Sequence, residues 1–516
     1  MKDDSFLITF HYLASENRLE LLNGVNAGQT SLASVTVGDS YGQYPQSAID
    51  AFQLAINDAN VVLADCATTS TAMTQALSDF QSAKAVFDAA IVNDPVLKIY
   101  SGYNFSGEEK EIYCGYYNGT LGENDDWAVS FTLEKGYMAT FAEHINGTGA
   151  SKVYVAADAD LSINLPANLQ QKVSFIRISP WRNIKKKGLG AKGDDVVAAL
   201  DNSWYYNWGT TGESIGDAEF VPNQWGGGSI AKAVSLGERM DITHYMAFNE
   251  PDNEDQSNMT VDKAIEKYEE LLASGLRLGS PANTDGAVGA AWRDEFMTKA
   301  EANGLRVDYM VVHYYKKTTP EGFYNWLKAI YDKWQRPIWI KEFNYGATWV
   351  SNKPTTNEDA SDGLESYINK LDDTDFIERY AVFTWQPDNA VYSLMSVRTP
   401  VTLSTSGVMY RDHISPVAYT QEVYEQGEQL SVGDNSIDST ILIYPTVVKD
   451  GVLNFVYSNE MKNSKIELTI YNTMGQQIKK VSNLGSSINI SNLSVGVYIV
   501  KIKSGFNYFT KKIIVN

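Results

Sequence analysis

Two glutamates, Glu250 and Glu342, stand at the ends of short apolar runs, HYMAFNE and IWIKEFN. If both runs are strands that end at the same edge of a sheet, the two carboxylates face one another. At a separation of about 5–5.5 Å, one carboxylate can attack an anomeric carbon while the other protonates the leaving oxygen, with retention of configuration. A wider gap admits a water molecule and gives inversion. The spacing therefore predicts a pair of acids that cleaves glycosidic bonds.

The residues around this pair have side chains that suit the same chemistry. Asn249 carries an amide able to hydrogen-bond a sugar 2-hydroxyl, an interaction that strengthens in the transition state. His313 and Tyr315 end another apolar run, DYMVVHYY, and either could donate to Glu342 and keep it ionised. We expect Glu250 to be the less stabilised partner, retaining its proton because of the nearby negative charge.

Aromatic residues concentrate in the same part of the chain. The sequence has 31 Tyr and 11 Trp, and all but one of the Trp lie between Trp181 and Trp385. Concentrated aromatic rings suit a cleft that stacks on sugars, although some of them must belong to the core because strand residues alternate faces. The predicted lining residues are Tyr206, Asn207, Trp208, Trp225 and Trp385, with Trp208, Trp225 and Trp385 the strongest.

A repeated strand and helix pattern over residues 180–418 positions these side chains. Eight apolar runs alternate with helical stretches, which predicts a (β/α)8 TIM barrel with its chemistry at the carboxyl ends of the strands. Glu250 and Glu342 close the fourth and seventh runs. The eight runs are residues 185–191, 203–209, 219–226, 244–250, 276–283, 308–315, 338–344 and 380–387.

The remaining segments predict a multidomain chain of 516 residues. Residues 1–95 show the 3.6-residue period of amphipathic helices, and residues 96–179 read as short strands of an all-β domain. Residues 419–440 are polar and acidic, as in a linker, and residues 441–516 alternate again, as in a small β-sandwich.

Charge and composition exclude several classes of function. The formal net charge of −21 disfavours nucleic acid as a partner, and no apolar run is long enough to span a membrane. The start, MKDDSFLITF, shows no export signal. No phosphate-binding loop, HExxH or CxxC motif occurs, so we expect no cofactor and no zinc. We expect a monomer that acts on a polysaccharide.

The motifs SWYYNWG, FVPNQWGG, AFNEPDNEDQSNMT, GSPAN, VDYMVVHYY and RPIWIKEF occur in this order. In combination they resemble glycoside hydrolase family 128, clan A barrels that cleave β-1,3-glucan, over residues 180 to about 390. The resemblance implies a retaining mechanism with Glu250 as acid/base and Glu342 as nucleophile.

Three further resemblances concern the flanking segments. GQYP and the regular Ala pattern of residues 42–92 resemble FIVAR-like helical modules, and KIYSGYNFSG with AVSFTLEKGY and VSFIRI resembles a βγ-crystallin domain. The second implies a candidate calcium site at Asp125, Asp126 and Ser130. YPTVVKDGVLNF, IYNTMGQQI and LSVGVYIVKI resemble the C-terminal sorting domain of the type IX secretion system, which implies contact with that machinery and export in a Bacteroidota-type organism.

Two other functions fit the same residues. One is a retaining endo-hydrolase of another β-linked polysaccharide, such as a galactan or a xylan, which would use the same two carboxylates. The other is a surface glycan-binding protein with an inactive barrel, and the presence of both carboxylates argues against it.

Overall fold

The computed structural model describes residues 16–38, 41–228, 231–384, 390–420, 441–444, 447–449, 451–457, 466–472, 476–482, 485–504 and 507–515. The predicted linker at residues 419–440 lies outside the described residues except for Tyr419 and Thr420. Clustering of contacts separates an N-terminal helical unit from the rest of the chain.

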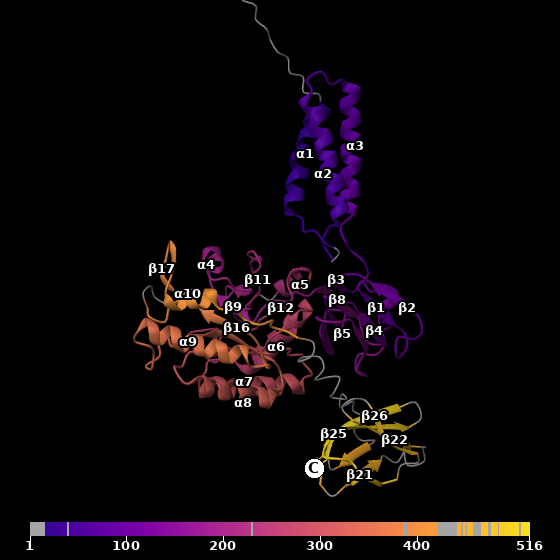
Figure 1. Ribbon diagram of the computed structural model, residues 1–516, viewed down its shortest axis with the longest axis vertical. Helices are drawn as coiled ribbons and strands as arrows, with labels where there is room; N and C mark the ends of the chain where they lie inside the picture. Colours follow the sequence, from indigo (N-terminus) through magenta and orange to yellow (C-terminus); the bar gives the residue numbers. More distant parts are fainter. Residues whose placement is uncertain are drawn as a thin grey trace, which may run out of the picture. The chain divides into compact units, whose positions relative to one another are not determined.

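Three helices form the N-terminal unit, in the segment where the sequence predicts helices (Figure 1). Apolar residues three or four apart on each helix meet in one core, because this spacing places them on one face. Thr69 begins the third helix, where its hydroxyl accepts a hydrogen bond from the Ala72 amide. The helices are α1 (Glu16–Ser34), α2 (Gln46–Ala64) and α3 (Ser70–Ala89), and the core includes Leu21, Phe52, Ile56, Phe80 and Phe87.

Two antiparallel four-stranded sheets make up the next segment. Rings of Phe131, Phe141 and Tyr154 pack together between them. The first sheet contains β2 (Glu109–Ile112), β1 (Leu97–Tyr100), β4 (Ser130–Leu133) and β7 (Leu161–Asn164), and the 3-10 helix η1 spans Gly122–Asn124. The second sheet contains β3 (Gly115–Asn118), β8 (Phe175–Pro180), β5 (Tyr137–Ala142) and β6 (Ser151–Ala156), so β8 runs across the predicted border between residues 179 and 180.

Eight parallel strands then form a closed ring. Six of them lie in one sheet and two in another, and the parallel bridges Asn223↔Met246 and Gly279↔Tyr309 join the two sheets at both edges. Each strand coincides with or overlaps one of the eight predicted runs. In chain order they are β9 (Lys187–Gly190), β10 (Trp204–Tyr206), β11 (Glu219–Phe220), β12 (His244–Tyr245), β13 (Arg277–Leu278), β14 (Met310–Tyr314), β15 (Ile338–Phe343) and β16 (Ile377–Phe383).

Helices follow most of these strands and cover the outside of the ring (Figure 1). The expected strict alternation is wrong at one place, because residues 207–218 connect β10 to β11 without a helix. The helices are α4 (Asp194–Ala199), α5 (Lys232–Gly237), α6 (Val261–Leu271), η2 (Leu272–Ser274), α7 (Ala287–Ala302), α8 (Pro320–Trp334), α9 (Asn357–Asp372) and α10 (Thr405–Asp412), with a hairpin of β17 (Met395–Arg398) and β18 (Val401–Leu403) before α10.

Alternate strand residues face opposite sides of the ring. One buried cluster fills the interior and includes Trp204, Tyr206, Tyr309, Val311 and Trp339. A second cluster lies between the strands and the helices and includes their neighbours Tyr205, Met310, Ile338 and Ile340. This period of two decides which side chains can reach a site inside the ring.

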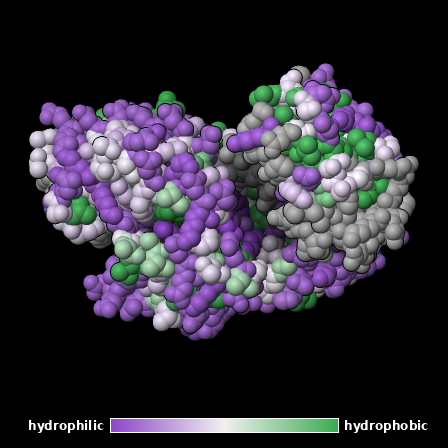
Figure 2. Space-filling model, turned by 90° about the horizontal axis from the view of Figure 1, so that it is seen from below, coloured by the Kyte–Doolittle hydropathy of each residue, from purple (hydrophilic) through white to green (hydrophobic). Residues whose placement is uncertain are grey.

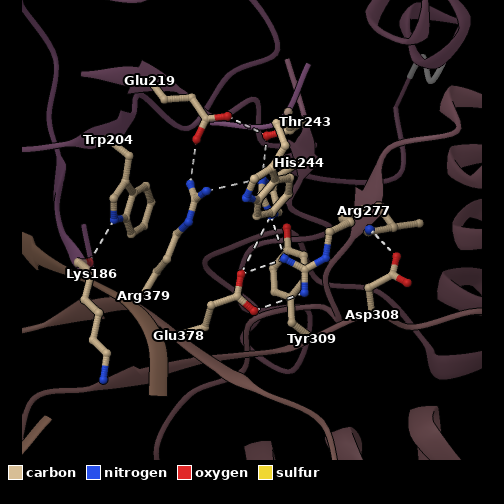
Figure 3. A network of polar contacts seen from close by, with 12 residues as sticks. Lys186, Trp204, Glu219, Thr243, His244, Arg277, Asp308, Tyr309, Glu378 and Arg379 are labelled. Atoms are coloured by element: carbon tan, nitrogen blue, oxygen red, sulfur yellow. Dashed lines mark hydrogen bonds and ion pairs between the residues drawn. The ribbon is translucent and has the colours of Figure 1, made fainter. Parts of the chain in front are cut away.

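A buried ionic network lies at the amino ends of the strands (Figure 3). Arg277 donates to both carboxylate oxygens of Glu378, at 2.6 and 3.0 Å, and Arg379 donates to Glu219 at 2.8 Å. His244 lies between the two arginines, and burial together with their charges holds its pKa well below the usual value. Because chemistry in parallel rings sits at the carboxyl ends, this network belongs to the stability of the fold.

Side chains of the β-rich segment, residues 96–179, donate hydrogen bonds to backbone carbonyls in the segment that forms the ring. Arg177, fully buried in β8, donates to the carbonyls of Gly237, Arg239 and Ile242. Thr140 donates to the carbonyl of Gly275 at 2.6 Å. These contacts join the two segments into one packed body.

The C-terminal segment contains a three-stranded and a five-stranded sheet and has its own apolar core. Its strands are β19 (Ile441–Tyr444), β20 (Val447–Val448), β21 (Val452–Tyr457), β22 (Ile466–Asn472), β23 (Gln477–Ser482), β24 (Ser487–Asn489), β25 (Gly496–Ser504) and β26 (Asn507–Val515).

The face of the molecule in Figure 2 is mainly hydrophilic, with apolar residues in small groups. Among the described residues, no helix combines the length and the apolarity needed to cross a membrane.

Candidate active site

One imidazole ring lies between the two predicted catalytic carboxylates. Nδ1 of His313 is 2.8 Å from Oε1 of Glu250, and its Nε2 is 3.5 Å from Oε1 of Glu342. His313 is buried, and its Nε2 has no hydrogen-bond partner closer than this. The fold therefore brings together Glu250, His313 and Glu342 at the carboxyl ends of their strands.

Three neutral donors hold the Glu342 carboxylate. Oε1 accepts from the phenol of Tyr206 at 3.0 Å and from the indole of Trp208 at 2.7 Å, while Oε2 accepts from Tyr315 at 2.6 Å. Burial raises the pKa of Glu342, but the charges of His313 and Lys341 and the Tyr315 hydrogen bond outweigh it, so the pKa lies below the usual value. Glu342 is thus a buried, ionised carboxylate.

Glu250 has a different environment. Its Oε1 pairs with His313, and its Oε2 accepts from Nδ2 of Asn253 at 3.0 Å. Burial raises the pKa of Glu250, but the hydrogen bond and charge of His313 and the contact with Asn253 lower it more. The expectation that Glu250 alone retains its proton is therefore wrong for the free protein, in which His313 favours the carboxylate form.

Glu250 and Trp208 both have left-handed backbones, with φ of 41° and 62°. This region is sparsely populated by residues other than glycine and costs on the order of 1–3 kcal/mol. In both cases the strained backbone carries a side chain that belongs to the carboxylate site. Pro251 follows Glu250, so the bridged segment that extends from β12 to Asn249 ends where the carboxylate is presented.

A β-bulge in β15 brings two consecutive side chains into the site. Val312 pairs with Ile340 and His313 with Glu342, so β15 advances two residues while β14 advances one. On the other side, Ile340 and Phe343 pair with Tyr380 and Val382. As a result Lys341 and Glu342 both face the interior, where strict alternation would place only one of them.

Asn249 and Trp225 lie on the opposite side of the site. The amide of Asn249 is almost completely buried, with Oδ1 accepting from Nζ of Lys341 and Nδ2 donating to Gln256 at 3.1 Å. Trp225 is 42% exposed, and its carbonyl accepts from the Asn249 backbone. Trp225 and Trp208 line a cavity of about 900 Å³, together with Asn223, Gln224, Ser257 and Met259. Trp208 connects this cavity to the carboxylates, because its indole also donates to Glu342.

One of the predicted lining residues stands apart from the carboxylates. Asn207 stays in its own loop, where it donates to the Thr211 carbonyl and accepts from the Gly209 amide. Trp385 lies outside the described residues.

Several site residues are absent from the sequence-based prediction. Lys341 was missed because alternation places it on the opposite face from Glu342. Asn253 and Trp349 lie in loops, where no period applies. Trp349 is 58% exposed, and its ring makes an edge contact with the ring of Tyr315 at 4.9 Å. The signal available in the sequence was a Trp in the loop directly after IWIKEFN.

The candidate calcium residues do not form a set of free ligands. Ser130 is fully buried, donating to the Gly102 carbonyl and accepting from the Phe105 amide, and Asp126 accepts from Ser174 at 3.3 Å. Within the described parts of the chain, no group of three or more His, Cys, Asp or Glu side chains could hold a metal ion.

The chain is similar to known proteins in two segments. Residues 190–410 match the family described as glycosyl hydrolase catalytic core, and residues 442–516 match the secretion system C-terminal sorting domain. A search among curated proteins finds no match.

Similar solved structures include three from glycoside hydrolase family 128. A subgroup I endo-β-1,3-glucanase from Amycolatopsis mediterranei, in complex with laminaritriose, is 30% identical, with 44% of this chain and 98% of the other covered and a TM-score of 0.38. A subgroup II endo-β-1,3-glucanase from Sorangium cellulosum is 23% identical, with 45% and 100% covered and a TM-score of 0.39. A subgroup VII oligosaccharide-binding protein from Trichoderma gamsii is 21% identical, with 44% and 93% covered and a TM-score of 0.37.

Proposed function

The chain is a glycoside hydrolase with a type IX sorting domain that directs it to the cell surface or the extracellular space, and we propose that it cleaves β-1,3-glucan internally. In this proposal residues 180–418 form a (β/α)8 barrel of the family 128 type. Glu342 is the nucleophile, Glu250 is the acid/base, and configuration is retained. Both carboxylates lie within 3.5 Å of a ring nitrogen of the same imidazole, that of His313. This observation carries the proposal.

The contacts of Glu342 suit a nucleophile. Its lowered pKa leaves it ionised, and the three donors fix both oxygens so that one can attack the anomeric carbon. As that bond forms, the bond to the leaving oxygen breaks and a covalent glycosyl-enzyme results. The donors also stabilise the carboxylate after it departs in the second step.

Glu250 supplies the proton as one member of a pair. In the free protein Nδ1 of His313 lies 2.8 Å from Oε1 of Glu250, and this contact favours the carboxylate form of Glu250. When substrate excludes water, the Glu250 carboxylate is buried further, which favours its protonated form. Glu250 then protonates the leaving oxygen and afterwards removes a proton from the water that hydrolyses the intermediate.

The substrate class rests on the motif resemblance to family 128 and on the likeness to the Amycolatopsis mediterranei endo-β-1,3-glucanase. The cavity beside the carboxylates and the exposed rings of Trp225 and Trp349 offer aromatic surfaces for several sugar units. An open cleft with such surfaces favours internal cleavage. The proposed enzyme acts as a monomer.

We propose a FIVAR-like helical module at residues 1–95, a βγ-crystallin-like domain at residues 96–179 and a sorting β-sandwich at residues 441–516. The fastening of the β-rich segment through Arg177 favours a fixed support for the barrel over a mobile binding module.

Product lengths over time test this proposal. We expect laminarin and curdlan to yield a broad range of oligosaccharides early in the reaction, and xylan and β-linked galactan to yield none. Cleavage of xylan or galactan alone would assign the enzyme to that substrate instead. Binding of glucan without release of any sugar would identify a glycan-binding protein.

A further inference from the structure

The proposed mechanism leaves one buried cation of the site unused. The side chain of Lys341 is completely buried, and Nζ contacts Oδ1 of Asn249 and lies 3.8 Å from Oε1 of Glu342. The Tyr206 ring faces the same nitrogen at 5.1 Å. A buried ammonium is costly unless it is paired, so its place beside two proposed catalytic groups requires an explanation.

We propose that Lys341 is a positioning residue for hydrolysis, fixing the Asn249 amide in one orientation and supplying the positive charge that faces Glu342. This inference rests on the proposed function and concerns how the same site is held in its working form.

The orientation of Asn249 follows from the donors available to each group. A lysine ammonium can only donate, so the Asn249 atom that it contacts must be the carbonyl oxygen. The amide nitrogen therefore points the other way, toward Gln256. Without Lys341 only Gln256 holds the amide, and an amide partner can turn over together with Asn249. The turned amide would present an acceptor where a donor to the sugar hydroxyl is needed.

The charge of Lys341 acts on Glu342 over 3.8 Å, between two buried side chains. Lys341 is one of the groups that lower the pKa of Glu342, and Glu342 in turn favours the protonated lysine. Burial lowers the pKa of Lys341 to about 8, so the ammonium is present at neutral pH and below. The bulge in β15 is the feature that allows both residues to face the same space.

Three substitutions separate the two roles of Lys341. Lys341→Met removes both donor and charge, Lys341→Gln keeps a donor but no charge, and Lys341→Arg keeps both. We expect Lys341→Met to lower kcat on laminarin by about 100-fold with little change in KM, because a misplaced catalytic group costs that much. Lys341→Gln should retain more kcat than Lys341→Met.

The acid limb of the pH–activity profile shows whether Lys341 positions the catalytic groups or only stabilises the fold. Glu342 must be ionised, so activity falls as the pH drops through its pKa. Loss of the Lys341 charge raises that pKa, and the acid limb of Lys341→Met and Lys341→Gln should move to higher pH. In Lys341→Arg the limb should stay at its wild-type position.

Lys187 provides a matched control. It is also a buried lysine whose pKa burial lowers to about 8, but it donates to the carbonyls of Tyr410, Arg411 and His413, away from the carboxylates. Lys187→Met should lower the melting temperature and leave the acid limb unchanged.

Unchanged acid limbs in folded Lys341→Met and Lys341→Gln would overturn the inference. If Lys341→Met does not fold, an unchanged limb in Lys341→Gln alone has the same meaning. If the wild-type chain hydrolyses laminarin and these variants have the same acid limb as the wild type, only the inference is contradicted. A wild-type chain that releases no sugar contradicts the proposed function, and the inference with it.

Discussion

The phenol of Tyr315 lies 2.6 Å from Oε2 of Glu342, while the neighbouring phenol ring of Tyr314 points to the other side of β14 and stacks on Phe323 at 4.1 Å. Adjacent tyrosines thus have separate roles, one in the site and one in the packing between strands and helices. Burial and Glu342 hold the pKa of Tyr315 well above its usual value, so it remains a neutral donor.

We predict that Tyr315→Phe moves the acid limb of kcat/KM to higher pH. The hydrogen bond favours the charged form of Glu342, and its loss raises that pKa. A hydrogen bond to a charged group contributes about 1.5–3 kcal/mol, which corresponds to a shift of the acid limb by about 1–2 pH units. The matched control Tyr314→Phe should keep the wild-type limb. Equal profiles for the two variants would remove Tyr315 from the site.

The stereochemistry of the first product provides a second prediction. With Glu342 as nucleophile, hydrolysis proceeds through two displacements and retains configuration. Proton NMR of a laminarin digest should therefore show the β-anomer of the new reducing end before mutarotation. Early appearance of the α-anomer would mean inversion, and Glu342 would then act as a base on water.

The exposed tryptophans should contribute to substrate binding. Trp225 and Trp349 are each more than 40% exposed, and both belong to loops beside the carboxylates. We expect Trp349→Ala and Trp225→Ala each to raise KM for laminarin by about 10-fold, since an aromatic contact contributes roughly 0.5–1.5 kcal/mol beyond its area. Val288→Ala, at a position that is 69% exposed on α7, is the control. Unaltered KM values would place the sugar elsewhere.

The buried network at the amino ends of the strands should affect stability and not catalysis. Glu378→Gln leaves Arg277 with an unpaired charge in the interior, which costs about 3–5 kcal/mol. The exposed pair Lys328 and Asp332 offers a control, because Asp332→Asn should cost less than about 1 kcal/mol. Thermal melting compares the two variants. A small effect for Glu378→Gln would show that water reaches the network.

Much of the site could be predicted from the sequence because apolar runs mark the strands and their ends mark the chemistry. Glu250, Glu342, His313 and Tyr315 were all found in this way. Either Tyr315 or His313 was predicted to donate to Glu342; Tyr315 does so, whereas His313 lies closer to Glu250. Which carboxylate a ring meets depends on side-chain rotamers that no periodicity encodes.

Other features could not be predicted for identifiable reasons. The β15 bulge breaks the two-residue period, so Lys341 reads as an outward residue. The link from β10 to β11 lacks a helix, and its length alone does not distinguish it from a helical connection. The contacts of Arg177 are with backbone carbonyls, whose positions depend on the whole fold.

The central claim is that Glu250 and Glu342 act on one glycosidic bond. Release of reducing ends from laminarin by the wild-type chain, Glu250→Gln and Glu342→Gln tests it most directly, with folding checked by thermal melting. We predict that the wild-type chain releases sugar and that each variant loses turnover by about 10³-fold or more. Near-normal turnover by either folded variant would contradict the account.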